Sequence, residues 1–498
     1  MKKTFFTLVM VALSLSSAWG GNRIERPKLV VGLVVDQMRW DYLYYYYEDF
    51  CEGGLKRLVD EGFSCENNMI NYIPTITAIG HTSIYTGTVP ALHGIAGNNF
   101  MEKGKDVYCC SDSTVKGVGT DSKAGKMSPR NNKATTIGDE LRLATNFKSR
   151  VFGVALKDRA AIFPAGHSAN AAYWYDNSVG HFVTSTYYME QLPKWVEQFN
   201  KQNATKPKED QKMKPEGVSI TFKMAEAILQ NEQLGKGDYP DMLTISVSST
   251  DAIAHSYGTR SEESKAAYMT LDKELAKFLS LLDEKYGKDG YLLFLSADHG
   301  GAHNPNYLKS HKIYANGWAA SDYRKSINAK LQAKYGMEKL VLAHYGDFFY
   351  LDHAKIESAN LNIDEVKQVV INELLQEDDL LYVVDCAKAS TATIPQIIRE
   401  RIINGYNRLR SGDIIAIPRS QMFSWKFKDD YTGTTHSEWN PYDSHIPLVF
   451  LGWKIKHGST SLPTRIVDIA PTVCAMLHIQ MPNSCIGDAI LPVVQQGK

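Results

Sequence analysis

The chain has 498 residues, and its 55 Lys and Arg residues are balanced by 55 Asp and Glu residues. A chain of this length buries a large core, either as one large domain with insertions or as two smaller domains. The balanced charge gives no overall attraction to nucleic acid or to an acidic membrane, so selectivity for a charged ligand must come from local groups.

Residues 1–20 have the organisation of a secretory signal peptide. Lys2 and Lys3 precede an apolar run at residues 5–15, and small residues follow up to Gly20. This order is typical of a Sec-type signal, and the apolar run is too short to span a bilayer. We therefore expect a periplasmic or secreted protein whose mature part, residues 21–498, does not insert into a membrane. A frayed N-terminal helix of a cytosolic protein is the alternative.

Seven cysteines lie in the mature part, at positions 51, 65, 109, 110, 386, 474 and 485. An oxidising compartment permits disulfides, and Cys51/Cys65 and Cys474/Cys485 are candidates because they are close in sequence. The odd number leaves at least one thiol unpaired. None has the paired Cys-x-x-Cys spacing of a structural zinc site, so we interpret the cysteines as structural.

Apolar runs alternate with helical patterns along the chain. The runs predicted as strands lie at residues 30–35, 151–156, 242–247, 291–295 and 446–451. They suit strands buried on both faces of a parallel sheet, and patterns such as 261–286 and 466–477 predict the helices between them. The sequence therefore predicts an α/β fold with a central, mostly parallel sheet and helices on both faces. Ligands of such sheets gather beyond the carboxyl ends of the strands.

Two stretches have the pattern of insertions. Residues 166–215 contain an aromatic run and a charged tract at 201–214, which predict an excursion ending in a solvated loop. Residues 305–435 have their own alternation of apolar runs and helical patterns. We expect the second stretch to form a cap or subdomain over the carboxyl-end rim of the sheet.

Residues 73–99 predict a turn with an exposed hydroxyl, a short apolar helix and a Gly-rich turn. The first turn would present Thr77 at a helix start, where free N–H groups and the helix dipole favour an anion. Gly94 and Gly97 allow unusual dihedrals, which would bring Asn98 alongside as a neutral donor. A threonine hydroxyl is a weak nucleophile, and it needs a base or a metal to become reactive.

Candidate metal ligands occur at four further places in the chain. Asp36 and Asp298-His299 each follow a predicted strand, and Asp251 and His255 stand four residues apart on one face of a predicted helix. His445 lies just before the last predicted strand. Distant sequence positions would thus converge on one rim of the sheet.

Thr77, Asn98 and these six Asp and His residues, in this order, resemble the alkaline phosphatase superfamily, in its branch of phosphodiesterases and PafA-type phosphate monoesterases. The resemblance runs from about residue 30 to the C-terminus. It implies two metal ions, each bound by part of this set. One zinc site would use Asp251, His255 and His445. The other site would use the remaining ligands, which are Asp36, Asp298, His299 and the Thr77 oxygen. Zinc accepts such His and carboxylate ligands, and cobalt or manganese would fit the same groups.

The resemblance also implies a mechanism. The metal beside Thr77 would activate its hydroxyl as the nucleophile, the second would stabilise the leaving oxygen, and a phosphothreonine would form and be hydrolysed. Lys157 and Arg159, two apart after a predicted strand, would both point at the phosphoryl site, where monoesterases of this superfamily have a Lys-x-Arg pair. We therefore expect an exported two-zinc alkaline phosphatase that acts on small phosphate monoesters.

Several alternatives stay open. A type I phosphodiesterase or nucleotide pyrophosphatase would use the same metal core, although Lys157 and Arg159 oppose it. A sulfatase or a mutase of the superfamily is a second alternative, but sulfatases carry a formylglycine where Thr77 stands and the mutases are cytosolic. A non-catalytic phosphate-binding protein is a third alternative, and such a protein would be expected to lack a ligand. Among the other histidines, His81 and His93 would hold the motif turns by hydrogen bonds. His303 and His436 flank ligand segments and are either supporting groups around the ligands or ordinary polar residues.

Overall fold

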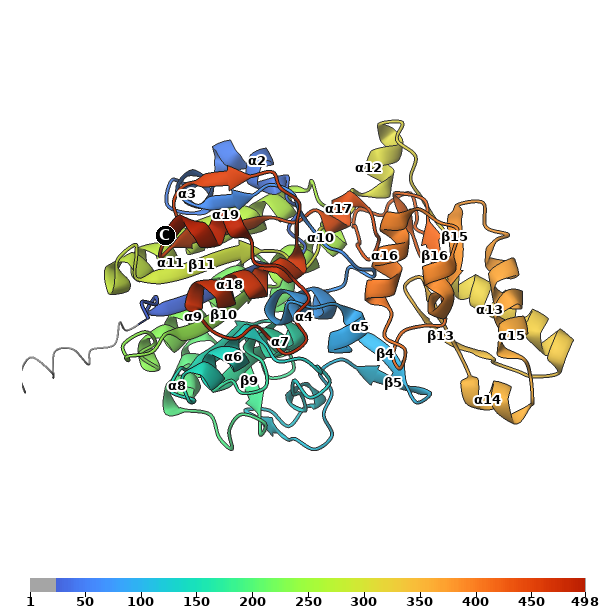
Figure 1. Ribbon diagram of the computed structural model, residues 1–498, viewed down its shortest axis with the longest axis horizontal. Coiled ribbons are helices and arrows are strands. Elements are labelled where there is room, and N and C mark those ends of the chain that lie inside the picture. The colour runs from blue at the N-terminus through green and yellow to red at the C-terminus, as the bar shows by residue number, and fades with distance from the viewer. Residues whose placement is uncertain (1–23, 498) are drawn as a thin grey trace, which may run out of the picture.

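The computed structural model describes residues 24–497, so the predicted signal peptide at 1–20 lies outside the described residues. The described part is built around one ten-stranded mixed sheet with helices packed on it (Figure 1). Its spatial order is β19 (Gly458–Thr460), β2 (Phe63–Cys65), β18 (Leu448–Gly452), β11 (Tyr291–Ser296), β1 (Leu29–Val35), β10 (Asp241–Val247), β7 (Val151–Ala155), β8 (Ala171–Asp176), β9 (His181–Ser185), β6 (Gly117–Val118).

The strands from β11 to β8 are parallel, as their continuous apolar runs predict. Every residue of β1, β10 and β11 is buried, which is typical of a sheet covered on both faces. The strand predicted at 446–451 forms as β18, but it runs antiparallel to β11. The prediction of a parallel strand there was wrong, because an apolar run does not encode strand direction.

Helices cover both faces of the sheet. Helix α9 (Glu216–Asn231) lies on the connection from β9 to β10. Two crossovers join parallel strands: the one from β7 through α7 (Asp158–Ala165) moves outward to β8, whereas the one from β10 through α11 (Glu262–Tyr286) moves the chain back to β11. Since such crossovers are right-handed, opposite directions place the helices on opposite faces. On one face α4 (Thr77–Thr86) packs against α7 and α18 (Ile469–Leu477), and on the other α9 packs against α11. The predicted α/β architecture is confirmed.

The register aligns the carboxyl ends of the central strands. Val35 at the end of β1 pairs with Val247 of β10, and the preceding Val34 pairs with Ser296 of β11. The residues that follow these strands therefore emerge at one rim. Asp36 comes directly after β1, and Asp298 comes two residues after β11.

The predicted excursion at 166–215 belongs instead to the main sheet. β8 pairs parallel to β7, and β9 pairs antiparallel to β8. The aromatic run Tyr173, Trp174 and Tyr175 is the centre of β8, and all three side chains are buried. The prediction of an excursion was wrong because a short aromatic run suits a buried strand as well as a loop. Helix α8 (Lys194–Asn203) then leads through 204–215 to α9.

Residues 305–435, which we call the cap, contain a separate four-stranded sheet and a hydrophobic cluster of their own, and they share a second cluster with Ile73 of the main domain. Figure 1 shows this unit beside the rim of the main sheet where α4 and α5 (Pro90–His93) lie. Its elements are α12 (Pro305–Ser310), β12 (Asn316–Gly317), α13 (Ala320–Tyr335), β13 (Val341–Tyr345), β14 (Phe348–Leu351), α14 (His353–Ser358), α15 (Ile363–Leu374), β15 (Leu380–Asp385), α16 (Gln396–Gly405), β16 (Ile414–Pro418), β17 (Met422–Phe423).

The cap is docked through buried polar and backbone contacts. A Cβ at Gly405, the last residue of α16, would lie 1.7 Å from the carbonyl oxygen of Ile73, so only glycine permits this approach. The guanidinium of Arg401 donates to the carbonyl of Trp439 and, at 3.1 Å, to the hydroxyl of Ser444. The cap thereby contacts both the segment before Thr77 and the segment that leads into β18.

All seven cysteines are free thiols in this structure, so neither predicted disulfide candidate is bridged. The sulfur of Cys51 faces the carbonyl of Asp272 at 3.9 Å, whereas Cys65 is buried in β2. Among residues 24–497, none of the helices combines the length and apolarity needed to cross a bilayer.

Candidate metal centre and active site

Thr77 is the first residue of α4, as predicted, and its side chain is buried. The preceding Ile76 provides no side-chain cap, so the N–H groups of the first turn are not satisfied by a capping residue. The N–H of Ala78 donates to Oδ1 of Asn98 at 3.1 Å. This contact fixes the orientation of the Asn98 amide and leaves its NH₂ group as a donor beside the helix start.

Gly80 allows α4 to lie directly against the segment of Asp298. A Cβ at Gly80 would be 2.2 Å from the Asp298 carbonyl oxygen and 2.6 Å from its Cα. Both of these atoms belong to the backbone, so they could not move aside as a flexible side chain would. The glycine therefore sets the distance between the Thr77 helix and one of the predicted ligands.

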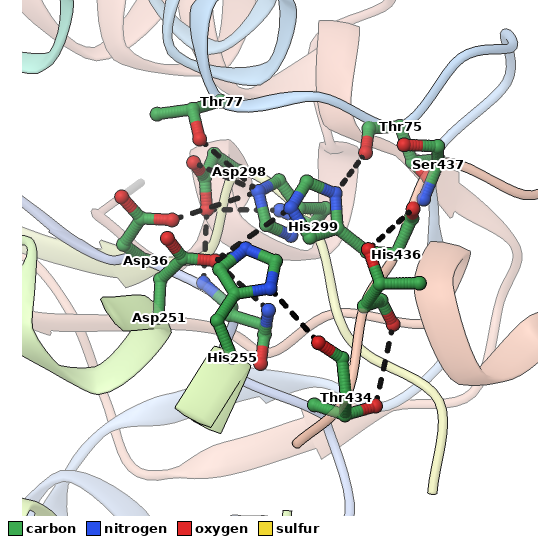
Figure 2. Close-up of polar contacts among 12 residues, drawn as sticks. Asp36, Thr75, Thr77, Asp251, His255, Asp298, His299, Thr434, His436 and Ser437 are labelled. Carbon is green, nitrogen blue, oxygen red and sulfur yellow. Dashed lines mark hydrogen bonds and ion pairs between the residues drawn. The ribbon is translucent and has the colours of Figure 1, made fainter. Parts of the chain in front are cut away.

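Two overlapping groups of Asp and His side chains lie at this rim (Figure 2). In the first group the ligand atoms of Asp251, His255 and His436 all lie within 4.8 Å of one another. The second group meets the same limit and consists of Asp36, Asp251 and His299. Asp251 belongs to both groups, so the two candidate metal positions are adjacent.

Three histidines of these groups are oriented in the same way. Each donates its Nδ1–H to a backbone carbonyl, because a carbonyl can only accept: His255 to Thr434 at 2.9 Å, His436 to Thr75 at 2.6 Å, and His299 to Gly300 at 2.9 Å. The Nε2 lone pairs consequently face carboxylates, at 3.1 Å for His255, 3.6 Å for His436 and 3.5 Å for His299. A backbone partner on the far nitrogen is the usual arrangement around a metal-binding histidine.

The carboxylates of the site also favour a cation. Burial, followed by repulsion from Asp251 and Asp298, raises the pKa of Asp36 well above its usual range. Oδ1 of Asp36 and Oδ2 of Asp298 are buried and accept no hydrogen bond. His81 lies 3.2 Å from the Asp298 oxygen, but its Nδ1–H is directed at the Thr77 carbonyl at 2.9 Å. Crowded, unpaired oxygens facing imidazole lone pairs fit divalent metal ions, and the chemistry of the donors fits zinc.

Lys157 lies closer to the metal ligands than the sequence predicted. Its Nζ is 2.5 Å from Oδ2 of Asp36 and 2.5 Å from Oδ2 of Asp251. The side chain is 6% exposed, so it places a buried positive charge beside one carboxylate of each group. Gln37, which the sequence analysis missed, donates its Nε2 to Oδ1 of Asp251 at 2.8 Å.

Arg159 lies in the first turn of α7, two residues after Lys157. The pair is not part of an extended strand, because Lys157 is the cap residue at the start of this helix. Nη1 of Arg159 donates to the Tyr108 hydroxyl at 3.1 Å, whereas its Nε is buried without a partner. One edge of the guanidinium is thus fixed and another remains to meet an oxygen of a ligand.

His445 does not join the other predicted ligands, and this prediction needs correction. Its Nε2 donates to the carbonyl of Glu66 at 2.9 Å, and its ring stacks on Trp40 with centroids 4.5 Å apart. The third residue of the first group is His436, whose ring stacks on His299 at 3.5 Å. His436 and His445 both follow the cap in sequence, so the sequence alone does not show which of them reaches the other ligands. The path of the chain after the cap decides this.

The sequence profile of the family "Type I phosphodiesterase / nucleotide pyrophosphatase" matches residues 30–443. The chain belongs to this family. Within the family, the chain is 44% identical over 538 aligned positions to "Alkaline phosphatase PafA" of Elizabethkingia meningoseptica, covering 98% of each chain. It is 42% identical to "Alkaline phosphatase PhoV" of Synechococcus elongatus, covering 95% of this chain and 94% of that relative. The predicted membership in the superfamily and in its PafA-type branch is confirmed.

The solved structures give the same result for the fold of this family member. The crystal structure of wild-type PafA aligns with a TM-score of 0.91, covering 95% of this chain and 100% of PafA. A PafA variant in which one threonine, one asparagine, one lysine and one arginine are substituted aligns with a TM-score of 0.90. Across most of its length the chain therefore has the fold of PafA.

Proposed function

We propose that this protein is an exported alkaline phosphatase, a two-zinc phosphate monoester hydrolase that acts through a phosphothreonine at Thr77. The observation that carries the proposal is the position of the Thr77 hydroxyl. Its Oγ1 lies 3.4 Å from Nε2 of His299, at the start of a helix and beside both Asp/His groups. PafA and PhoV, which match nearly the whole chain, are both named alkaline phosphatases.

The ligands of one zinc ion would be Asp251, His255 and His436. Those of the other would be Asp36, Asp298, His299 and the Thr77 oxygen. When bound, the ions lower the pKa of the Thr77 hydroxyl and neutralise charge on the reacting oxygens. The buried, unpaired carboxylate oxygens and the three Nε2 lone pairs support this assignment.

The protein's own residues would carry out the attack on phosphorus and would bind the phosphoryl oxygens. Thr77 Oγ1 gives up its proton to solvent and attacks phosphorus, the P–O bond to the ester oxygen breaks on the opposite side, and the leaving oxygen takes a proton from water to become the alcohol. Free N–H groups of the α4 start and the NH₂ of Asn98 donate to the phosphoryl oxygens. The phosphothreonine is then cleaved by water at phosphorus, which regenerates Thr77. Catalysis of this kind depends mainly on positioning and on charge stabilisation.

Lys157 and Arg159 support a monoester over a diester. A monoester dianion has two charges on its terminal oxygens, whereas a diester has one charge and a second organic group in that space. Hydrogen bonds to charged groups contribute about 1.5–3 kcal/mol each, so two cations could change the preference by several orders of magnitude. The PafA variant is substituted at a lysine and an arginine separated by one residue, the spacing of Lys157 and Arg159.

Rates on p-nitrophenyl phosphate and methyl p-nitrophenyl phosphate, measured with metal-analysed protein, test the proposal. We expect about two zinc ions per chain, a strong preference for the monoester, and loss of both activities in chelator. Lys157→Ala/Arg159→Ala should lower the monoesterase rate far more than the diesterase rate. A wild type that cleaves the diester faster would make the chain a phosphodiesterase on the same metal core. Export rests on residues 1–20, and N-terminal sequencing of the mature protein tests it.

A further inference from the structure

A short hairpin follows Asn98, which is proposed to contact the phosphoryl group, and ends at Tyr108. Its strands are β4 (Asn99–Glu102) and β5 (Lys105–Tyr108), and Asn99 pairs with Tyr108 in the register. The N–H of Cys109 donates to the carbonyl of Asn98 at 2.9 Å. The base of the hairpin therefore holds Tyr108 beside the segment of Asn98, although the hairpin turn separates them in sequence.

The hydroxyl of Tyr108 joins this hairpin to the start of α7. It lies 2.5 Å from Oδ1 of Asp158 and 3.1 Å from Nη1 of Arg159. A guanidinium can only donate and an ionised carboxylate can only accept, so the hydroxyl accepts from Arg159 and donates to Asp158. The two contacts use the hydroxyl in both roles, and a phenyl ring could replace neither.

We propose that Tyr108 is a positioning residue that holds the guanidinium of Arg159 towards the phosphoryl site and away from Asp158. This inference rests on the proposed function, because it assumes that Arg159 contacts the phosphoryl oxygens. Tyr108 itself is not expected to touch the substrate.

The physical reason is competition between two anions for one guanidinium. Nη1 of Arg159 is 3.8 Å from Oδ1 of Asp158, just beyond a hydrogen bond. The Tyr108 hydroxyl donates to that oxygen, so the carboxylate is satisfied without drawing the guanidinium onto itself. Without the hydroxyl, Asp158 would attract Arg159 directly, and Arg159 would spend less time in the orientation that meets a phosphoryl oxygen.

The surroundings keep the phenol protonated and therefore able to donate. Burial, together with the charge of Asp158, raises the pKa of Tyr108 well above its usual range. The guanidinium of Arg159 opposes this shift but does not cancel it. The arrangement is consequently stable across the pH range in which a phosphatase would be assayed.

Tyr108→Phe tests the inference in zinc-loaded full-length protein, with rates on p-nitrophenyl phosphate and methyl p-nitrophenyl phosphate. We expect kcat/KM for the monoester to fall about 10- to 100-fold, the effect of losing one charge-assisted contact. The diester rate should change less than about threefold, since the diester has a second organic group in place of the second charged oxygen that Arg159 would meet. The unchanged diester rate also reports that the variant is folded and metal-loaded.

Tyr345→Phe is the matched control. Its hydroxyl donates to Asp106 of the same hairpin at 2.7 Å but makes no contact with Arg159, so both rates should be retained. Tyr108→Phe added to Arg159→Ala should cause no further loss of monoester activity. A full additional loss in that double variant, or an equal loss on both substrates in Tyr108→Phe, would overturn the positioning role. If Arg159→Ala alone leaves the monoester preference intact, the proposed role of Arg159 fails, and the inference fails with it.

Discussion

Asp443 forms hydrogen bonds with two segments that carry candidate metal ligands. Its Oδ2 accepts from the N–H groups of Ser437 and Glu438 at 3.0 and 2.8 Å, directly after His436. Its own carbonyl accepts from the N–H of Gly300 at 2.7 Å, next to His299. Oδ1 accepts no hydrogen bond, and the side chain is fully buried.

Burial raises the pKa of Asp443 to about 8, although the two N–H groups and Arg39 act in the opposite direction. Below about pH 4 the carboxyl is protonated in both the folded and the unfolded chain. As the pH rises towards 8, the unfolded chain releases the proton and the folded chain keeps it, so the free energy of unfolding decreases. A difference of about four pH units corresponds to on the order of 5 kcal/mol, an upper limit for one fully buried group.

Asp443→Asn removes the titration while its amide oxygen still accepts from both N–H groups. The variant should therefore become more stable than the wild type as the pH rises, with the difference growing by about 3–5 kcal/mol between pH 4.5 and 8.5. Urea unfolding at several pH values, at one fixed zinc concentration, measures this difference directly. Asp322→Asn, on the exposed face of α13, is the control, and its profile should run parallel to that of the wild type. Parallel profiles for Asp443→Asn as well would refute the argument.

Three further predictions follow from the site. His436→Ala should lose about one zinc equivalent and nearly all activity, whereas His445→Ala should retain both; elemental analysis with rate measurements checks this. Acid quenching with a ³²P-labelled monoester should label the wild type on Thr77 and leave Thr77→Ala unlabelled. Gly80→Ala should lower kcat/KM by at least tenfold and the unfolding free energy by about 1–3 kcal/mol, because its Cβ would meet backbone at 2.2 Å. Gly237→Ala, with open space around the added Cβ, should change neither.

The sequence predicted the centre of the fold because continuous apolar runs and strand ends followed by Asp are local signals. The sequence alone places Asp36 and Asp298 at the rim, since parallel strands end at the same edge of a sheet. The same reasoning failed at the sheet margins. The strand direction of β18 and the pairing of β8 depend on which neighbour is available, and no local pattern encodes that.

Contacts between side chains that are far apart in the sequence could not be predicted either. Lys157 meets Asp36 and Asp251 at separations of 121 and 94 residues, so its depth in the site could not be read from a Lys-x-Arg pair. His436 was noted only as a flanking residue, since it and His445 both follow the cap. The one local difference is that His436 sits in a loop after a glycine, whereas His445 leads almost directly into the buried strand β18.

The contacts of Thr75 support Thr77 as the proposed nucleophile better than the sequence could. The Thr75 hydroxyl donates to the carbonyl of Glu438 at 3.1 Å and accepts from the N–H of Ser437 at 3.2 Å. Its carbonyl in turn accepts from His436. Thr75 is thus fully engaged in joining the turn before α4 to the segment that returns from the cap. The Thr77 hydroxyl instead faces His299, and a nucleophile needs a hydroxyl that is free to approach its activating groups.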